Sequence, residues 1–133
     1  MPMLTVKLAA QPSAELSHRV ANCLTHLTRT VLHKDPSVTA VAIEYVDPTL
    51  WFVSGFASAP AYFVEIRVTE GTNIKSEKAE YISRVHAELE SLLGGAGPAS
   101  YVQIAEVHAD SYGYGGLTAE QRYIAPLPIA TPA

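Results

Sequence analysis

The sequence has few of the residues that mark a disulfide-bonded, membrane-spanning or nucleic-acid-binding protein. Cys23 is its single cysteine, so no disulfide can form within one chain. No apolar run approaches the roughly 20 residues of a membrane-spanning helix, and the N-terminus lacks the basic and apolar regions of a signal peptide. Nine Lys and Arg residues against thirteen Asp and Glu residues form no basic stripe. We therefore expect a cytoplasmic protein that binds neither nucleic acid nor a membrane.

Common catalytic and metal-binding patterns are missing as well. The histidines, at positions 18, 26, 33, 86 and 108, are dispersed without ligand spacing. No Ser/His/Asp, Cys/His or phosphate-loop pattern occurs. Cys23 lies among helix-forming residues, which favours a buried thiol over a reactive one. We expect no metal and no cofactor.

What the sequence does contain is a strand-helix-strand pattern that occurs twice. A chain of 133 residues that is 48% hydrophobic can bury one core, so we expect a single domain over residues 1–133. Its two units span residues 2–55 and 62–116, and a tail follows over residues 117–133. Each unit predicts a right-handed βαβ arrangement with parallel strands. The predicted fold class is α+β, built from tandem βαβ units.

The first unit opens with a strand in which apolar and polar residues alternate up to Leu8. Ser13 is the predicted N-cap of a helix that reaches about His33. The apolar stripe of this helix consists of Leu16, Val20, Leu24, Leu27 and Val31. Residues 38–46 are nearly continuously apolar, which predicts a second strand in the interior of a sheet.

The second unit repeats these elements. Residues 62–68 form a strand that aligns on residues 2–8, and Asn73 is the predicted N-cap of a helix ending near Leu93. Its predicted buried stripe consists of Ile82, Val85, Leu89 and Leu92. A fourth strand is expected over residues 101–108, and residues 112–116 are the counterpart of residues 51–55. The tail has prolines at 126, 128 and 132, so we expect it either to clasp a neighbouring chain or to fray.

Pro2 is unusual because it follows the initiator methionine at the tip of a core strand. Removal of Met1, which is usual before a small residue, would leave a secondary amine there. An α-amino group has a pKa of roughly 7.7–8.0, and an apolar pocket disfavours its charged form, so the nitrogen could be a base near neutral pH. The alternative is that Pro2 simply begins an edge strand without needing an N–H. The equivalent residue of the second unit is Tyr62, which has no free amine.

The order and spacing of several short motifs resemble the tautomerase superfamily. In the second half, residues 66–71 (Ile-Arg-Val-Thr-Glu-Gly) and 112–116 (Tyr-Gly-Tyr-Gly-Gly) are similar to segments of 4-oxalocrotonate tautomerase. In the first half, Pro2-Met3 and residues 34–38 are similar to macrophage migration inhibitory factor. The resemblance covers about residues 2–116. It implies a four-stranded sheet with two helices on one face, and a homotrimer of such sheets around a central channel.

A trimer also agrees with a physical argument. Two amphipathic helices can cover only one face of the sheet, so its other face needs a partner. That face carries either Met3 and Thr5 or Val41, Ile43 and Tyr45.

The resemblance implies roles for particular residues. Pro2 is the catalytic base that takes a proton from the substrate and returns it elsewhere. Lys34 is the substrate-facing cation, although a lysine at a helix C-terminus can also be a solvated residue that favours the dipole. Trp51 and Tyr112 match aromatic residues that wall the family's pocket, but both could equally be core or interface aromatics. Gln103 matches a pocket position too, or is an ordinary sheet residue.

One departure from the family concerns charge. The arginines that 4-oxalocrotonate tautomerase uses for a dicarboxylate are replaced by Pro12, Thr39, Thr72 and Gln103. We therefore expect Lys34 to supply the main positive charge and a monocarboxylate to be the better substrate. The strand positions of Lys7 and Arg67 are expected to point these cations into the trimer interface or channel.

The most specific function predicted is a cofactor-independent keto-enol tautomerase, an isomerase that acts on a small-molecule carboxylate or enol. A dehalogenase or decarboxylase of the same superfamily is an alternative, and Glu106 or Asp110 would then activate water. A non-catalytic trimeric binding module is the other alternative, because a retained Met1 turns the Pro2 nitrogen into an amide without a basic lone pair.

Overall fold

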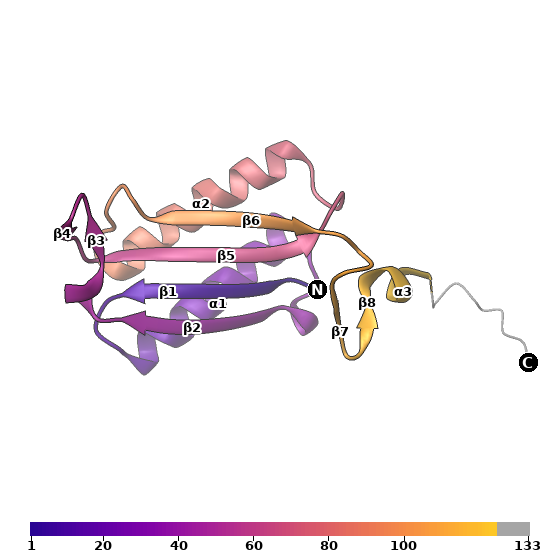
Figure 1. Ribbon diagram of the computed structural model, residues 1–133, viewed down its shortest axis with the longest axis horizontal. Helices are drawn as coiled ribbons and strands as arrows, with labels where there is room; N and C mark the ends of the chain where they lie inside the picture. Colours follow the sequence, from indigo (N-terminus) through magenta and orange to yellow (C-terminus); the bar gives the residue numbers. More distant parts are fainter. Residues whose placement is uncertain (125–133) are drawn as a thin grey trace, which may run out of the picture.

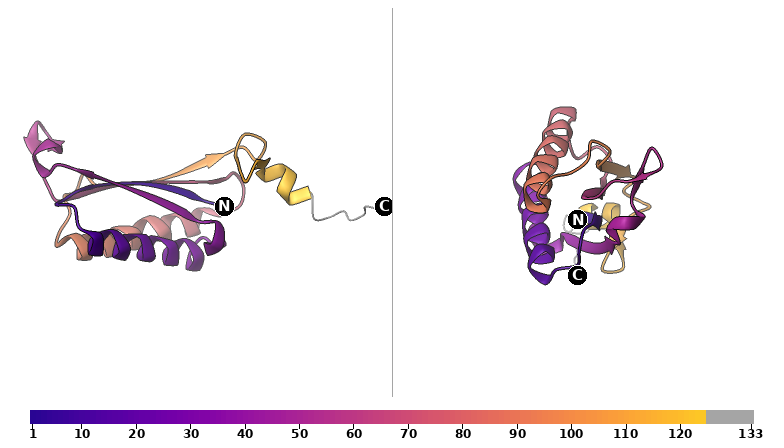
Figure 2. Two further views of the ribbon diagram at one scale, coloured as in Figure 1. Left: turned by 90° about the horizontal axis from the view of Figure 1, so that it is seen from below. Right: turned by 90° about the vertical axis from the view of Figure 1, so that its left-hand side faces the viewer.

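Four strands form one sheet, and two long helices cover one of its faces (Figures 1 and 2). This computed structural model describes residues 1–124, so the prolines predicted to end the tail lie outside the described residues. The order across the sheet is β2 (Ala40–Val46), β1 (Met3–Ala9), β5 (Ala61–Thr69) and β6 (Tyr101–Val107). The helices are α1 (Ala14–Thr30) and α2 (Lys75–Leu93). The predicted α+β class and layer arrangement are confirmed.

The N-terminus of α1 is the predicted one, but its C-terminus is not. Ser13 caps the helix, and its side chain accepts a hydrogen bond from the Leu16 N–H at 3.1 Å. The helix ends at Thr30, before the predicted residue 33. His33 has a left-handed φ of 60°, and the Lys34 N–H donates to the Thr28 carbonyl at 3.2 Å. A reversal of the backbone thus ends the helix before Asp35-Pro36 is reached.

The start of α2 also differs from the prediction. The N-cap is Ile74 and not Asn73. The carboxylate of Glu77 accepts the Ile74 N–H at 3.0 Å and the Asn73 side-chain amide at 3.1 Å. Asn73 also donates to the Leu32 carbonyl at 3.0 Å, so its side chain ties α2 to the end of the first unit. Gly94, with a φ of 73°, ends α2 as the glycine-rich segment predicts.

The pairing of strands relates the two units by an approximate two-fold axis. β1 and β2 are parallel and start at the pair Met3 and Ala40, while β5 and β6 are parallel and start at Phe63 and Tyr101. β1 and β5 run antiparallel, with Val6 opposite Val64. The residues just before the two starts are Pro2 and Ser100's neighbour in the sheet, Tyr62. Pro2 and Tyr62 therefore lie at equivalent positions at opposite ends of the sheet (Figure 1).

The prediction that the second strand is interior is wrong for the single chain, because β2 is an edge strand. Its apolar run has two separate origins. Val41, Ile43 and Tyr45 face the helices and pack against the core, whereas Ala40 and Ala42 between them are exposed on the other face. Small alanines on an open face made the segment look buried on both sides.

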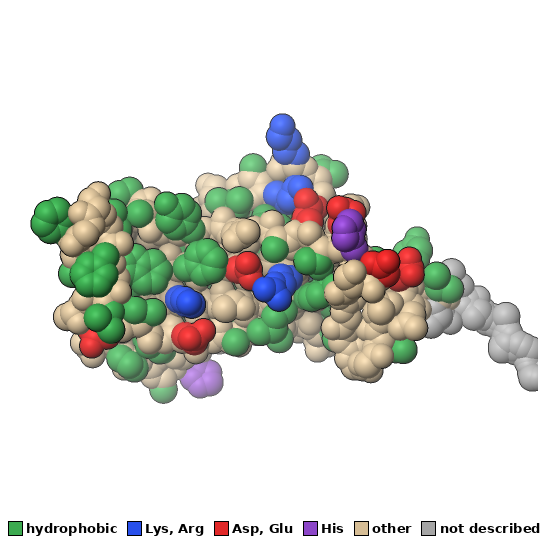
Figure 3. All heavy atoms as spheres, in the orientation of Figure 1, with side chains coloured by type: hydrophobic (Ala, Val, Ile, Leu, Met, Phe, Trp, Pro, Cys, Tyr) green, Lys and Arg blue, Asp and Glu red, His purple; other side chains and the backbone are tan. Residues whose placement is uncertain are grey.

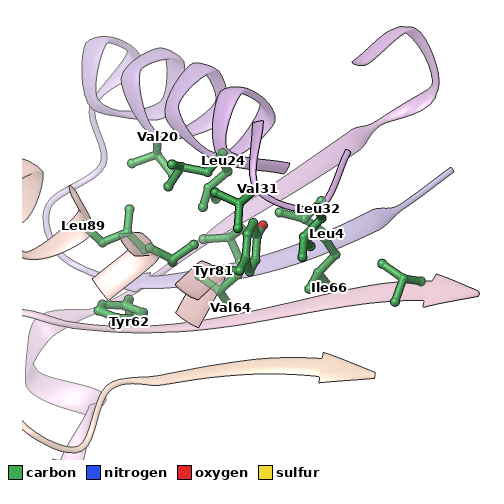
Figure 4. Close-up of a cluster of buried hydrophobic side chains, with 14 of the residues drawn as sticks. Leu4, Val20, Leu24, Val31, Leu32, Tyr62, Val64, Ile66, Tyr81 and Leu89 are labelled. Atoms are coloured by element: carbon green, nitrogen blue, oxygen red, sulfur yellow. The ribbon is translucent and has the colours of Figure 1, made fainter. Parts of the chain in front are cut away.

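The core fills the space between the sheet and the helices (Figure 4). The predicted stripe of α1 is buried at Val20, Leu24 and Leu27. On α2, Val85 and Leu89 are buried, but Ile82 is 40% exposed and Tyr81 takes its place in the core. The Tyr81 hydroxyl lies 2.8 Å from the Thr28 hydroxyl of α1. This bond satisfies both buried polar groups, and burial raises the pKa of Tyr81 to about 12.

Two small hairpins extend from opposite ends of the sheet (Figure 1). One consists of β3 (Phe52–Val53) and β4 (Phe56–Ala57), and the other of β7 (Gly113–Tyr114) and β8 (Leu117–Thr118). Single 3₁₀ turns precede β2 and β3, namely η1 (Pro36–Val38) and η2 (Pro48–Leu50). The short helix α3 (Ala119–Ile124) follows β8. The part of the tail up to residue 124 is thus folded against its own chain, contrary to the prediction.

The face of the sheet opposite the helices is open. It carries Met3, Thr5 and Lys7 of β1, while Val41 and its alternate neighbours lie on the helix side. Figure 3 looks onto this open face, where charged groups of both signs lie over the middle of the sheet. Glu65 and Arg67, 3.3 Å apart, form one ion pair there. Among the described residues, no helix is long and apolar enough to cross a membrane.

Candidate functional site

Pro2 is buried at the tip of β1, the central strand that begins next to the N-terminus. Its carbonyl accepts a hydrogen bond from the Ala40 N–H at 3.1 Å, which extends the β1–β2 ladder by one step. Met1 is half-buried and precedes it. The position of Pro2 is therefore fixed by the sheet itself and does not depend on a loop.

Tyr112 closes over this end of the sheet. Its hydroxyl lies 2.8 Å from the Met1 carbonyl oxygen and 3.3 Å from the Arg67 carbonyl oxygen, and its one hydrogen can be donated to either. Burial raises the pKa of Tyr112. A neutral phenol, which can donate a hydrogen bond, thus lies beside the first residues of the chain.

A hollow of about 510 Å³ lies against the N-terminus. Met1, Thr69 and Thr72 line one part of it, and residues of α3 line the other part. The α3 residues include Glu120, Arg122 and Tyr123. A hollow of this size can hold a small molecule, and it combines hydroxyl, cationic, acidic and aromatic groups.

Lys34 lies next to this hollow without lining it. Its ammonium donates to the Thr72 hydroxyl at 2.8 Å, and that hydroxyl donates to the Thr69 carbonyl at 2.6 Å. Burial lowers the pKa of Lys34, whereas the charges of Glu77 and Glu106 act in the opposite direction. Lys34 also acts on the terminal amine. The pKa of the Met1 amine lies below its ordinary value of 8.0, first because of burial and second because of the Lys34 charge, against a smaller raising effect of Asp35.

Arg122 is a site residue that the sequence reasoning missed. Its Nε and Nη2 donate to the Tyr114 carbonyl at 3.1 and 2.9 Å, and its guanidinium lies 3.9 Å from the centre of the Tyr114 ring. A signal for α3 was available in Thr118 and Gln121. The Gln121 side chain accepts the Thr118 N–H and the Thr118 hydroxyl accepts the Gln121 N–H, both at 2.9 Å, which is a capping box.

Two of the predicted site residues lie elsewhere in the chain. Trp51 follows η2 at the opposite end of the sheet from Pro2, where its carbonyl accepts the Ser58 N–H at 2.8 Å. Gln103 lies on the open face in the middle of β6, paired with Glu65. Within one chain the structure brings Pro2, Lys34 and Tyr112 to one end, but not Trp51 or Gln103.

The acidic residues considered for water activation also lie apart from the hollow's lining. Glu106 forms an ion pair with Lys78 at 2.9 Å, and this bond lowers its pKa. Asp110 is exposed in the turn before Tyr112 and accepts the Ser111 hydroxyl at 3.1 Å. Over residues 1–124, the His, Cys, Asp and Glu side chains form no group of three that could hold a metal ion.

Comparison with known proteins gives a clear result for the fold. No protein-family model and no curated protein matches the sequence. Solved structures do match over nearly the whole chain. A fused 4-OT described as a symmetric trimer gives a TM-score of 0.80 at 16% identity, covering 89% of this chain and 96% of that chain.

Two further solved structures extend the comparison. A macrophage migration inhibitory factor-like protein from Entamoeba histolytica gives a TM-score of 0.75 at 20% identity, covering 88% of this chain and 97% of that chain. The FG41 malonate semialdehyde decarboxylase inhibited by 3-bromopropiolate gives a TM-score of 0.73 at 16% identity, covering 91% and 95%. These proteins all belong to the tautomerase superfamily, and the chain shares their fold.

Proposed function

We propose that this chain, which has the fold of the tautomerase superfamily, is a cofactor-independent tautomerase with Pro2 as its base. Its substrate is a small enol or 2-keto acid. The observation that carries the proposal is the burial of Pro2 at the tip of β1, beside a hollow of about 510 Å³ that the preceding residue, Met1, lines. Removal of Met1 opens the nitrogen of Pro2 toward this hollow.

The local electrostatics support a neutral, basic amine at this end. Burial and the charge of Lys34 both disfavour an ammonium at the N-terminus, as the lowered pKa of the Met1 amine indicates. The nitrogen of Pro2 accepts the hydroxyl proton of an enol while the oxygen becomes a carbonyl, and the resulting ammonium returns the proton to carbon. No net proton is gained or lost, so the cycle needs no second reactant.

The phenol of Tyr112 supports the same chemistry. Its raised pKa keeps it a hydrogen-bond donor, and Met1 is one of its present acceptors. Without Met1, that hydrogen can be donated to a substrate oxygen on which negative charge develops.

We also propose that the active form is a homotrimer. The fused 4-OT neighbour is described as a symmetric trimer. In this chain, one face of the sheet is uncovered by the helices, and β2 is an exposed edge. Trp51 and Gln103 could approach a Pro2 site only from another chain. Light scattering should return about three times the 14.3 kDa chain mass, and a stable monomer would contradict this part of the proposal.

The catalytic proposal is tested with phenylpyruvate and two variants whose N-termini are read by intact mass. Pro2→Ala keeps a terminal amine but changes its basicity and placement. Pro2→Leu retains Met1, since a large second residue blocks its removal, and has no amine at position 2. We expect Pro2→Leu to lose about 10²–10⁴-fold in kcat/KM, with Pro2→Ala in between.

The matched control is Tyr62→Phe at the equivalent position of the second unit, which should keep its activity. Wild-type turnover in both Pro2 variants would remove Pro2 from the mechanism.

A non-catalytic binding module is the second candidate, and the Tyr112–Met1 contact favours it. A chain held by this hydrogen bond and keeping Met1 has a Pro2 amide without a basic lone pair. Intact mass decides between the two, because a purified protein that retains Met1 and turns over no substrate is the binding module. Decarboxylase or dehalogenase chemistry is less well supported, since Arg122 is the one arginine among residues 1–124 that lines the hollow.

A further inference from the structure

The short helix α3 supplies the cation that borders the hollow at the N-terminus. We propose that Arg122 binds the carboxylate of the substrate there, and that the substrate is a monocarboxylate with an uncharged body. This inference rests on the proposed function and assigns its substrate class. Arg122 is a binding residue in this role, and the base remains Pro2.

The guanidinium has hydrogen-bond donors left for a ligand. Both bonds to the Tyr114 carbonyl use Nε and Nη2, and neither uses Nη1. A planar guanidinium offers its remaining N–H groups in the fixed geometry that a carboxylate accepts. The hydroxyl of Thr72 lines the same hollow. The hollow therefore contains donors from both the sheet side and α3.

Arg122 is held in place before any ligand arrives. The Tyr114 carbonyl and ring fix the guanidinium, and Gly115 leaves room for it, because a Cβ at Gly115 would collide with Nη2. The helix itself is tied down at its first residues. The Ala119 N–H donates to the Tyr112 carbonyl at 2.7 Å, and the Glu120 N–H donates to the Ala109 carbonyl at 3.0 Å. Such preorganisation reduces the cost of ordering the side chain on binding.

Lys34 is less suited to the same task. It does not line the hollow, its ammonium is bonded to Thr72, and the carboxylates of Glu77 and Glu106 act on its charge. The sequence alone gave Lys34 the main positive charge. In this proposal Lys34 instead favours a neutral terminal amine, while Arg122 contacts the substrate's anionic group.

Glu120 and Tyr123 restrict the rest of the ligand. Glu120 lines the hollow together with Arg122, so a second carboxylate would meet a like charge. Tyr123 adds an aromatic wall beside Met1. These neighbours favour one carboxylate attached to an apolar or aromatic body.

The test measures binding by calorimetry and does not depend on turnover. The probes are phenylglyoxylate, a 2-keto acid that has no hydrogen on the carbon next to its carbonyl and so cannot enolise, and its methyl ester. The full chain, with its N-terminus read by intact mass, should bind the acid more tightly than the ester. Arg122→Gln should weaken acid binding about ten- to hundredfold, the effect of one charge-assisted hydrogen-bonded contact, and leave ester binding unchanged.

Two further variants keep the inference falsifiable if Arg122→Gln loosens α3. Arg84→Gln removes the same charge from the exposed surface of α2 and should bind both probes as the wild type does. Glu120→Gln should strengthen the binding of a dicarboxylate such as 2-ketoglutarate severalfold without weakening phenylglyoxylate.

The outcomes separate this inference from the proposed function. No acid binding by the wild type, equal losses of acid and ester in Arg122→Gln, or no loss of acid binding in that variant would each overturn it. Tight, Arg122-dependent acid binding by a protein that turns over no keto acid would reject the Pro2 mechanism and leave the Arg122 assignment intact.

Discussion

The two ends of the sheet are built by the same repeated unit, yet only one of them has the features of a site. Pro2 lies at one end and Tyr62 at the equivalent place of the other. Tyr62 is fully buried, and its hydroxyl lies 2.6 Å from Nδ1 of His86. Nothing at that position can become a free amine. The duplication thus provides two scaffolds, and the chain terminus provides one base.

The hairpins at the two ends differ in the same direction. The β3–β4 hairpin, at the Tyr62 end, exposes large apolar side chains, with Phe56 at 74% and Phe52 at 59%. Figure 3 shows hydrophobic side chains gathered at this end of the molecule. The β7–β8 hairpin, at the Pro2 end, is glycine-rich and leads into α3, whereas three residues join β4 to β5. An extra helix therefore borders only the Pro2 end, where it adds Arg122.

The largest effect on this difference is expected from Gly113→Ala. Gly113 and Phe52 occupy equivalent places in the two hairpins, each paired with the second residue of its partner strand. A Cβ at Gly113 would collide with the backbone of Leu117. Overpacking of this kind costs about 1–3 kcal/mol, so β7, β8 and α3 should open about one to two powers of ten more often.

Hydrogen exchange of residues 109–124 measures this opening directly. The amides of β1 and β5 should keep their wild-type exchange, which shows that the sheet is intact. The control is Phe52→Ala, which lies at the other end and should leave exchange at residues 109–124 unchanged. Wild-type exchange there in Gly113→Ala would mean that the hairpin adapts and that the glycine is not required.

A smaller effect, shared by both ends, is expected from Tyr81→Phe. The Tyr81–Thr28 hydrogen bond joins α2 to α1, one helix from each unit, and lies inside the core. Losing it leaves the Thr28 hydroxyl without this partner and should cost about 1 kcal/mol, or about 3–5 °C in Tm. Calorimetry should show one transition that moves as a whole.

The double variant Tyr81→Phe with Thr28→Val should recover much of that loss, since no polar group is then left unpaired. Tyr62→Phe, whose partner His86 is partly exposed, should have a smaller effect. A Tyr81→Phe protein as stable as the wild type would show that this bond contributes little.

Much of the fold could be predicted from the sequence because its periodic patterns are strong. The alternation in β1, the stripe of α1 and the repeat of the unit indicated the strands, helices and parallel pairs. Ile82 was wrongly placed in the core because a pattern based on hydrophobicity ranks it above Tyr81. The Thr28 partner that makes Tyr81 suitable for the core lies 53 positions away in the sequence.

The site could be predicted only in part, for a related reason. Pro2 and Tyr112 occur in recognisable motifs, whereas Arg122 lies in a tail whose prolines hid the capping box of Thr118 and Gln121. Its position beside the N-terminus depends on contacts between residues more than 100 positions apart, such as the Tyr112–Met1 bond. Local patterns carry no information about such contacts. Trp51 and Gln103 matched the same family yet lie elsewhere in the single chain, because a residue's motif does not specify which chain completes the site.

The smallest effect, and the one that separates Lys34 from Arg122, is expected in the titration of the terminal amine. Burial is the main cause of the lowered pKa of the Met1 amine, and the Lys34 charge is the second. Lys34→Met removes the charge but keeps much of the side chain's volume, so the pKa should rise toward its ordinary value. At neutral pH a smaller fraction of the amine is then uncharged.

The rate at which an acylating reagent labels the terminal amine follows that uncharged fraction, so it measures the change directly. In Lys34→Met the labelling rate should reach its plateau at a higher pH than in the wild type, for a chain that keeps Met1. For a chain that starts at Pro2, the rise of kcat/KM with pH should shift in the same direction, because the base must be neutral to accept a proton. Lys7→Met removes the same charge from the open face of β1 and should leave both profiles unchanged. Arg122→Gln should weaken acid binding without moving the labelling profile, since Arg122 is not among the groups that shift this amine. If Lys34→Met weakens acid binding as Arg122→Gln does and leaves the amine's titration in place, then Lys34 is the anion-binding residue after all.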